Sequence, residues 1–213
     1  MSHSQITTPV DDVLRQADEF FMETGPVHDT LRSLARRLPE EQIEYTIIGG
    51  MALALHGFVR PTQDIDLLMT PEGLDRFHER LVGRGYVPVF SGARKHFRDA
   101  ATGVKVEVIT TGEYPGDGKP KAVIFPDPVD VSVEVGDLHV VRIETLIELK
   151  LASGLSADHR MLRDLADVQQ LIETLDIPAE MAERLDPSVR DEFRHLWKLA
   201  QEARKEQNPT EED

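Results

Sequence analysis

Two glycines lie between a short apolar segment and a short helix-forming segment, and two aspartates follow in a second apolar segment. The glycines are Gly49 and Gly50, and the aspartates are Asp64 and Asp66, separated by Ile65. Because side chains alternate across a strand, both aspartates point to one face and Ile65 points to the other. Carboxylates about 7 Å apart repel each other, so both ionise readily only if a cation lies between them. The pattern therefore predicts a strand, a glycine turn, a helix and then a strand that carries a cation site.

A third carboxylate lies in a later apolar segment, residues 104–109. Its three valines alternate onto one face, while Lys105 and Glu107 share the other. Carboxylate oxygens are the ligands that Mg²⁺ prefers, and two such ions can clamp the attacking and leaving oxygens of an in-line displacement. We therefore expect Asp64, Asp66 and Glu107 to be catalytic and to bind two Mg²⁺ ions, with Glu107 helping to deprotonate an acceptor.

The glycine pair supplies a candidate phosphate site. Without side chains at Gly49 and Gly50, backbone N–H groups at the start of the helix can approach phosphate oxygens. Arg60 and Thr62 precede the acids and either contact phosphates or only shape the turn at Pro61.

Composition limits the class of protein. The chain has 213 residues, 40% hydrophobic residues and no cysteine, which is typical of one or two globular domains without disulfides or thiolate zinc sites. No apolar run is long enough to span a membrane, and the N-terminus lacks a secretory pattern, so we expect a cytoplasmic protein. The net charge of -15 argues against nonspecific nucleic-acid binding but leaves a local basic groove open.

Periodicity predicts the remaining elements. The strand candidates are residues 44–48, 64–69, 86–90, 95–99, 104–109, 129–135 and 138–143. The helix candidates are two within 11–38, then 51–56, 71 to about 84, 145–154, 158–174, 178–184 and 188 to about 206. This order predicts an α/β or α+β protein with four parts: N-terminal helices at 1–40, a core with a short mixed sheet at 41–143, a helical C-terminal region at 144–206 and a disordered acidic tail at 207–213.

The stretch from Ile47 to Leu68 resembles the nucleotidyltransferase superfamily, which includes DNA polymerase β and aminoglycoside nucleotidyltransferases. That superfamily has a glycine pair, then about ten residues, an Asp-x-Asp strand and a third acid on a later strand. The likeness is strongest to its small prokaryotic members, including the abortive-infection toxins of toxin–antitoxin pairs. Those members also have a lysine before an Arg-Asp-x-x-Asp motif, matched here by Lys150 and by residues 163–167. One departure is Gly50, where many members have a serine that reaches a phosphate.

The resemblance implies a nucleotidyltransferase fold and Mg²⁺-dependent transfer of a nucleoside monophosphate (NMP) from a nucleoside triphosphate (NTP), such as ATP. The acceptor would be a hydroxyl of a tRNA, a protein or a small molecule, and the protein could be a toxin with an antitoxin partner. Lys150 would bind the triphosphate, with Asp164 and Asp167 near the site or ordering Lys150. The alternative is a non-catalytic binding or regulatory protein of the same fold.

Simpler interpretations exist for each of these residues. The two aspartates of the 64–69 strand could form a solvated face, Glu107 could pair with Lys105, and Lys150 could lie on the surface. Asp164 and Asp167 could pair with arginines along their own helix. The basic residues 94–98 could contact an acceptor or a nucleotide, or protect an edge strand with charge.

Overall fold

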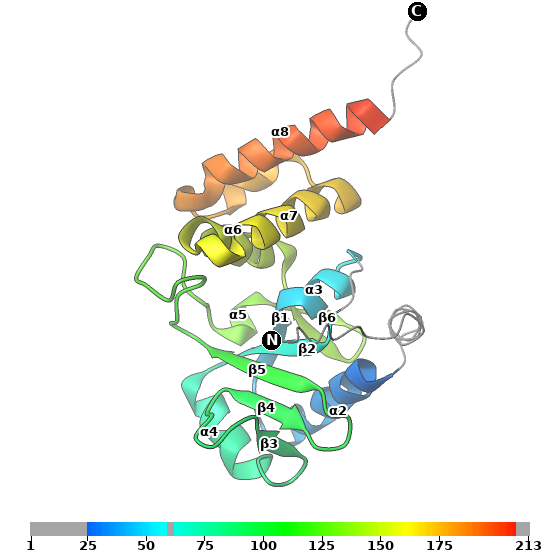
Figure 1. Ribbon diagram of the computed structural model, residues 1–213, viewed down its shortest axis with the longest axis vertical. Helices are drawn as coiled ribbons and strands as arrows, with labels where there is room; N and C mark the ends of the chain where they lie inside the picture. Colours follow the sequence, from blue (N-terminus) through cyan, green and yellow to red (C-terminus); the bar gives the residue numbers. More distant parts are fainter. Residues whose placement is uncertain (1–24, 59–61, 208–213) are drawn as a thin grey trace, which may run out of the picture.

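A computed structural model describes residues 25–58 and 62–207 as a mixed sheet with helices (Figure 1). The seven strands have the order β3-β4-β5-β2-β1-β7-β6, which confirms the predicted α/β class. Their bounds are β1 Tyr45–Ile48, β2 Asp64–Met69, β3 Tyr86–Pro88, β4 His96–Asp99, β5 Lys105–Thr110, β6 Ser132–Val135 and β7 Leu138–Val141. The expected helix before Gly25, Arg60 and most of the acidic tail lie outside the described residues.

The centre of the sheet combines two kinds of pairing. Strand β1 pairs antiparallel with β2 and parallel with β7, while β2 pairs parallel with β5. The outer pairs β3–β4, β4–β5 and β6–β7 are antiparallel. A strand on each side of β2 therefore brings residues distant in sequence beside Asp64 and Asp66.

The helices are α2 Pro26–Glu40, α3 Gly49–Leu55, α4 Pro71–Arg80, α5 Pro128–Val131, α6 Ile143–Ser156, α7 Asp158–Leu175 and α8 Arg190–Gln207, with 3-10 turns at Ala179–Arg184 and Pro187–Val189. Helix α4 begins as the sequence predicts, because Pro71 occupies its first turn and the Thr70 hydroxyl accepts a hydrogen bond from the Gly73 amide at 3.0 Å.

Part of the hydrophobic core lies on the face of the sheet opposite the two aspartates. Phe77 of α4 packs its ring 4.7 Å from that of Phe97 and 5.3 Å from that of Tyr86, centre to centre. Ile65 and Leu67 are fully buried, as their alternation with the acids predicts. The polar face of β2 is consequently left for chemistry.

Three sequence predictions require correction. Residues 129–131 are helical rather than part of a strand, because Pro128 starts α5 and the Asp127 carboxylate caps it by accepting from the Val129 amide. Helix α4 ends at Arg80, before the glycines at positions 83 and 85, which both have positive φ. The predicted helix at 178–184 is a 3-10 turn.

Helices α6, α7 and α8 form a separate layer beyond α3, on one side of the sheet (Figure 1). Trp197 of α8 donates its indole N–H to the Ile177 carbonyl at 3.0 Å, which fixes α8 to the segment that follows α7. Among the described residues, no helix combines the length and the apolar character that crossing a membrane requires.

Candidate active site

Strand register places the three predicted catalytic acids on one face of the sheet. Asp66 lies beside Glu107 in the parallel β2–β5 pair, and Asp64 lies beside Lys105. Partners in register project to the same face, so Asp64, Asp66 and Glu107 share it. The sequence predicted which face each side chain takes within its own strand. The register of β2 with β5 shows that the two faces are the same one.

Gly49 closes the site from the side of β1. It follows Ile48, the register partner of Asp66, and has φ of +66°. A Cβ atom at position 49 would lie 2.0 Å from Oδ2 of Asp66. Position 49 therefore requires glycine both for its backbone conformation and for the space that the Asp66 carboxylate occupies.

Replacing Gly49 with Ala should reduce nucleotide transfer at least about tenfold, because the new methyl group would displace the Asp66 carboxylate. The left-handed backbone should add about 1 to 2 kcal/mol of destabilisation. Transfer assays and urea unfolding of the variant would measure both effects. Gly83→Ala is the matched control, since φ there is +77° but a Cβ would meet no atom within 4 Å; a loss of transfer equal in the two variants would contradict the steric argument.

The electrostatics of Asp66 reflect crowding by negative charge. Burial, followed by the charges of Asp64 and Glu107, raises the pKa of Asp66 from 3.8 to about 7, while Lys150 and Arg160 lower it in part. The two cations belong to α6 and α7, so these helices contribute to the electrostatics of Asp66. Their effect is smaller than the combined effect of burial and the two neighbouring acids.

The set of donors fits a hard divalent cation. Within residues 25–58 and 62–207, no group of three or more His, Asp or Glu side chains is already arranged to hold a metal ion. However, three carboxylates share one face, and the raised pKa of Asp66 arises from burial and then from repulsion by Asp64 and Glu107, which a bound cation would relieve. The side chains of Asp64, Asp66 and Glu107 would have to rotate to converge on an ion.

The raised pKa of Asp66 predicts that the metal-free protein is less stable at high pH. The folded state holds this proton more tightly than the unfolded state, so stability falls as pH rises from about 4 to about 7 and the full cost remains above that range. Between about pH 5.5 and about pH 8, we expect a loss of about 2 kcal/mol relative to Asp66→Asn, which lacks this titration. Urea unfolding in a metal chelator would measure it; parallel pH profiles for the two proteins would contradict it.

Thr62 lies next to Asp64, and His96 lies next to Glu107. The Thr62 hydroxyl donates to Oδ1 of Asp64 at 3.2 Å, so this residue, expected to bind the nucleotide, orients an acid in this structure. Nε2 of His96 lies 3.5 Å from Oε1 of Glu107, and both side chains are about half exposed. His96 is also the register partner of Glu107 in β4.

Lys150 is buried and lies between two aspartates of α7. Its Nζ atom lies 3.1 Å from Oδ1 of Asp164 and 2.7 Å from Oδ2 of Asp167, and all three side chains are at most 10% exposed. Asp164 and Asp167 therefore both pair with Lys150 in the structure. Contact between Lys150 and a triphosphate stays a prediction.

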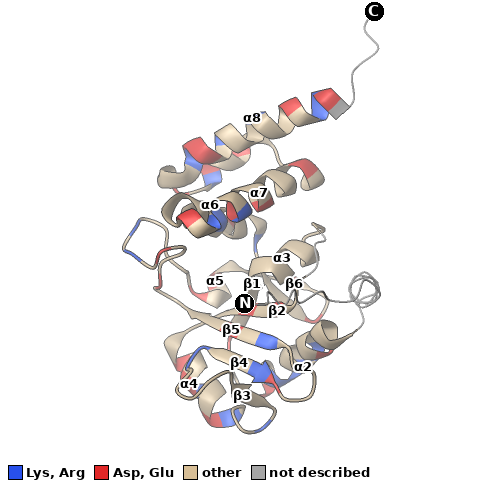
Figure 2. Ribbon diagram, viewed as in Figure 1, with Lys and Arg blue, Asp and Glu red and all other residues tan. Residues whose placement is uncertain are grey.

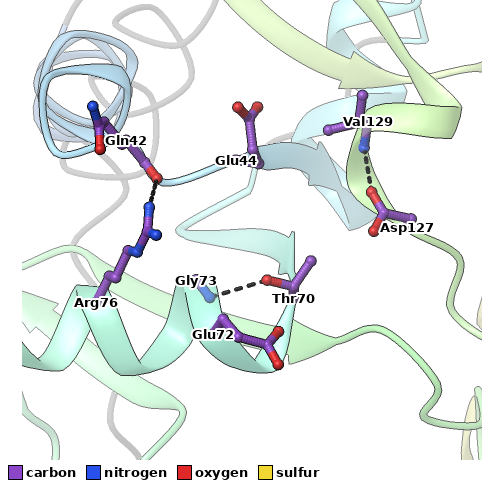
Figure 3. Close-up of a pocket in the computed structure, with 8 residues that line it drawn as sticks. All are labelled: Gln42, Glu44, Thr70, Glu72, Gly73, Arg76, Asp127 and Val129. Carbon is purple, nitrogen blue, oxygen red and sulfur yellow. Dashed lines mark hydrogen bonds between the residues drawn. The ribbon is translucent and has the colours of Figure 1, made fainter.

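A cavity elsewhere is unconnected with the acids. It has a volume of about 200 Å³ and lies beyond the Tyr45–Met69 end of the β1–β2 pair, whereas Asp64 lies at the other end. Figure 3 shows three hydrogen bonds among its lining residues, one of them from Arg76 to the Gln42 carbonyl at 2.7 Å. Its hydrogen bonds cap α4 and α5, so we assign the cavity a structural role.

Two features of the site escape prediction from the sequence. Arg160 influences Asp66 from the first turn of α7, and His96 reaches Glu107 through strand pairing. No local sequence pattern predicts either interaction, because both depend on which helices and strands become neighbours in the fold. Arg60, expected at the phosphates, lies outside the described residues.

A family model described as an uncharacterised nucleotidyltransferase matches residues 8–203. No curated protein matches the chain. Among solved structures, a Thermotoga maritima protein provisionally named a nucleotidyltransferase is 22% identical, with a TM-score of 0.46 over 78% of this chain and 99% of its own. JHP933 from Helicobacter pylori is 15% identical, with a TM-score of 0.45 over 92% and 96%. The antibiotic-resistance factor ANT(2'')-Ia is 14% identical, with a TM-score of 0.41 over 84% and 96%.

Proposed function

The chain belongs to the uncharacterised nucleotidyltransferase family, and from this premise we propose that it is an Mg²⁺-dependent enzyme that transfers an NMP from an NTP. In the reaction, an acceptor hydroxyl oxygen forms a bond to the α-phosphorus, and the bond from that phosphorus to the oxygen bridging to the β-phosphate breaks. Pyrophosphate leaves and the hydroxyl proton passes to a base. The observation that carries the proposal is the pairing of Asp66 with Glu107, beside Asp64, on one polar face.

The acids have separate roles in this proposal. Asp64 and Asp66 would hold both Mg²⁺ ions, and Glu107 would hold one of them. Bound Mg²⁺ supplies positive charge that offsets the charge of the phosphates and of the displacement. Thr62 keeps Asp64 oriented, and Glu107, which lies beside β4, would receive the hydroxyl proton of an acceptor that enters from the β4 side.

The nucleotide would bind on the β1 side of Asp66. Helix α3 begins at Gly49 without a side-chain cap, so the amides of its first turn are available to phosphate oxygens. Arg160 adds a cation that acts on Asp66; within the described part of the chain its side chain has no hydrogen bond or ion pair. Lys150 contributes charge at longer range from its buried position.

Labelled-nucleotide transfer tests the proposal. The full chain would be incubated with each α-³²P-labelled NTP, cell extract, and either Mg²⁺ or a chelator. The proposal expects label on RNA, on protein or on a small molecule, only with Mg²⁺. Metal-dependent NTP binding without transfer would instead favour a non-catalytic protein of this fold, and nucleotide loss without a labelled acceptor would indicate a hydrolase.

Several finer predictions belong to the same proposal. A role as the toxin of a toxin–antitoxin pair, with an antitoxin as partner, follows only from the likeness of Lys150 and residues 163–167 to toxin members of the superfamily. Preference for ATP over other NTPs has no residue that argues for it. The toxin role, the antitoxin partner and the preference for ATP therefore stay predictions.

A further inference from the structure

The polar face that carries the acids continues across β5, β4 and β3 as two rows of residues. In one row, Asp64 is followed by Lys105, Arg98 and Val87. In the other, Asp66 is followed by Glu107 and His96, and then by Val89, whose amide donates to the His96 carbonyl at 3.0 Å. One row passes over Lys105 and Arg98 and the other over His96, and both end at apolar side chains at the sheet edge.

These side chains are open to solvent. Phe90 is 61% exposed, Val87 is 42% exposed and Val89 is 39% exposed. The ring of Phe90 lies 6.4 Å from that of His96, with 31° between the ring planes. We call the six residues Val87, Val89, Phe90, His96, Arg98 and Lys105 the platform. Apolar groups this exposed, next to cations, mark an interaction surface.

The charge of the platform contrasts with that of the chain. The protein carries a net charge of -15, yet the exposed residues of β4 and β5 are His96, Arg98 and Lys105, and Figure 2 shows Lys and Arg segments on both strands. Within the described residues Lys105 has no ion-pair partner, and Arg98 only donates to the Gly103 carbonyl. The platform is therefore suited to an anionic ligand.

The platform lies on the opposite side of Asp66 from the expected nucleotide site. In the strand order, β5, β4 and β3 lie on one side of β2, whereas β1 and Gly49 lie on the other. A ligand on the platform would consequently reach the acids from the side of Glu107 and His96. This is the side from which an acceptor hydroxyl must enter.

We propose that the platform binds the acceptor, and that the acceptor is the 3′ end of a single-stranded nucleic acid. This rests on the proposed function. Cations bind phosphates and an exposed aromatic ring stacks on a base, which is the combination that single-stranded nucleic acid requires. From β3 to β5 the rows cross two strand spacings, about 10 Å, so a polymer lying along them contacts three strands and ends at Glu107. A small acceptor would leave the β3 end of the platform unused.

Fluorescence anisotropy with the full chain tests this inference. The probes are fluorescein-labelled single-stranded RNA and DNA of about 12 nucleotides, with Mg²⁺ and without NTP. Arg98→Glu should weaken binding about tenfold and reduce the salt dependence by about one phosphate contact. Phe90→Ala should weaken binding about fivefold or more through loss of stacking. Tighter binding of RNA than DNA would identify contacts to the 2′-hydroxyl; equal binding would identify phosphate and base contacts alone, and either supports the proposal.

Matched controls lie on the helical layer. Lys198→Glu makes a charge reversal on the exposed face of α8, and Leu162→Ala removes a side chain that is 81% exposed on α7; both should change binding less than about twofold. Thermal unfolding checks that each variant is folded. Wild-type binding by Arg98→Glu and Phe90→Ala, or equal displacement of the probe by polyglutamate, would overturn the proposal, the latter in favour of a protein acceptor.

The result is separable from the proposed reaction. Platform variants should keep the wild-type KM for NTP, since the nucleotide site lies on the β1 side. Platform-dependent binding without any nucleotide transfer would refute the proposed function. If the chain transfers NMP to a small molecule and Arg98→Glu leaves the rate of that transfer unchanged, the proposal for the platform is refuted and the proposed function stands.

Discussion

Replacement of Asp66 with Asn should reduce nucleotide transfer by at least about a thousandfold while leaving the protein folded. Asp66 is the register partner of Glu107, lies two residues from Asp64 on the same strand and packs against Gly49, so its carboxylate is central to the proposed site. An amide retains the size of the side chain but offers one weak oxygen ligand and no charge to Mg²⁺. Transfer of labelled NMP, measured with saturating Mg²⁺ and NTP, would give the loss.

The same variant should be at least as stable as the wild type in a chelator at high pH, because it lacks the charge that burial and two neighbouring acids disfavour. Mg²⁺ should raise the melting temperature of the wild type but not that of Asp66→Asn. Asp137→Asn, in the exposed turn between β6 and β7, is the matched control and should keep full activity. Substantial turnover by Asp66→Asn would remove the catalytic role of these acids.

Replacement of Lys150 with Met should destabilise the protein by about 3 to 5 kcal/mol. The lysine ammonium is the shared ion-pair partner of Asp164 and Asp167, and all three groups are buried. Removing the cation leaves two carboxylates in a poorly solvated site, where repulsion and desolvation add together. Urea unfolding monitored by circular dichroism would measure the loss.

Restoring neutrality should recover much of that loss. In the triple variant Lys150→Met, Asp164→Asn, Asp167→Asn no charge remains buried, and uncharged replacements of a buried ion-pair group are often close to neutral in stability. Lys198→Met, at an exposed position of α8, controls for the loss of a lysine and should cost less than about 0.5 kcal/mol. If Lys150→Met were equally mild, the ion pairs would carry little of the stability of the α6–α7 hairpin.

Local pattern predicts much of the site. Alternation alone places Asp64 and Asp66 on one face and Glu107 on the polar face of its own strand, and the structure bears out both. Alternation says nothing about which strands become neighbours. The pairing of β2 with β5, with 35 residues or more between partners in sequence, depends on packing across the whole sheet, so Glu107 beside Asp66 needed the family resemblance as well.

The failures have local physical causes. Residues 129–131 look β-branched and apolar, but Pro128 and the Asp127 cap make the segment helical. Gly49 appears in the sequence as a phosphate-approach glycine, and its contact with Asp66 depends on the β1–β2 register. Lys150 appears as a surface or ligand-binding residue, because its burial comes from the packing of α6 on α7.

The parallel β2–β5 pair also restricts how the chain can change in length. A single residue inserted or deleted within Lys105–Thr110 would turn Glu107 toward Phe77 and expose Val108, since side chains alternate with a period of two. Homologous proteins that keep the chemistry should therefore confine insertions to places such as the turn at residues 100–103, which precedes β5 at the surface. A screen of single-codon deletions across residues 95–112 should recover functional proteins only at such turns.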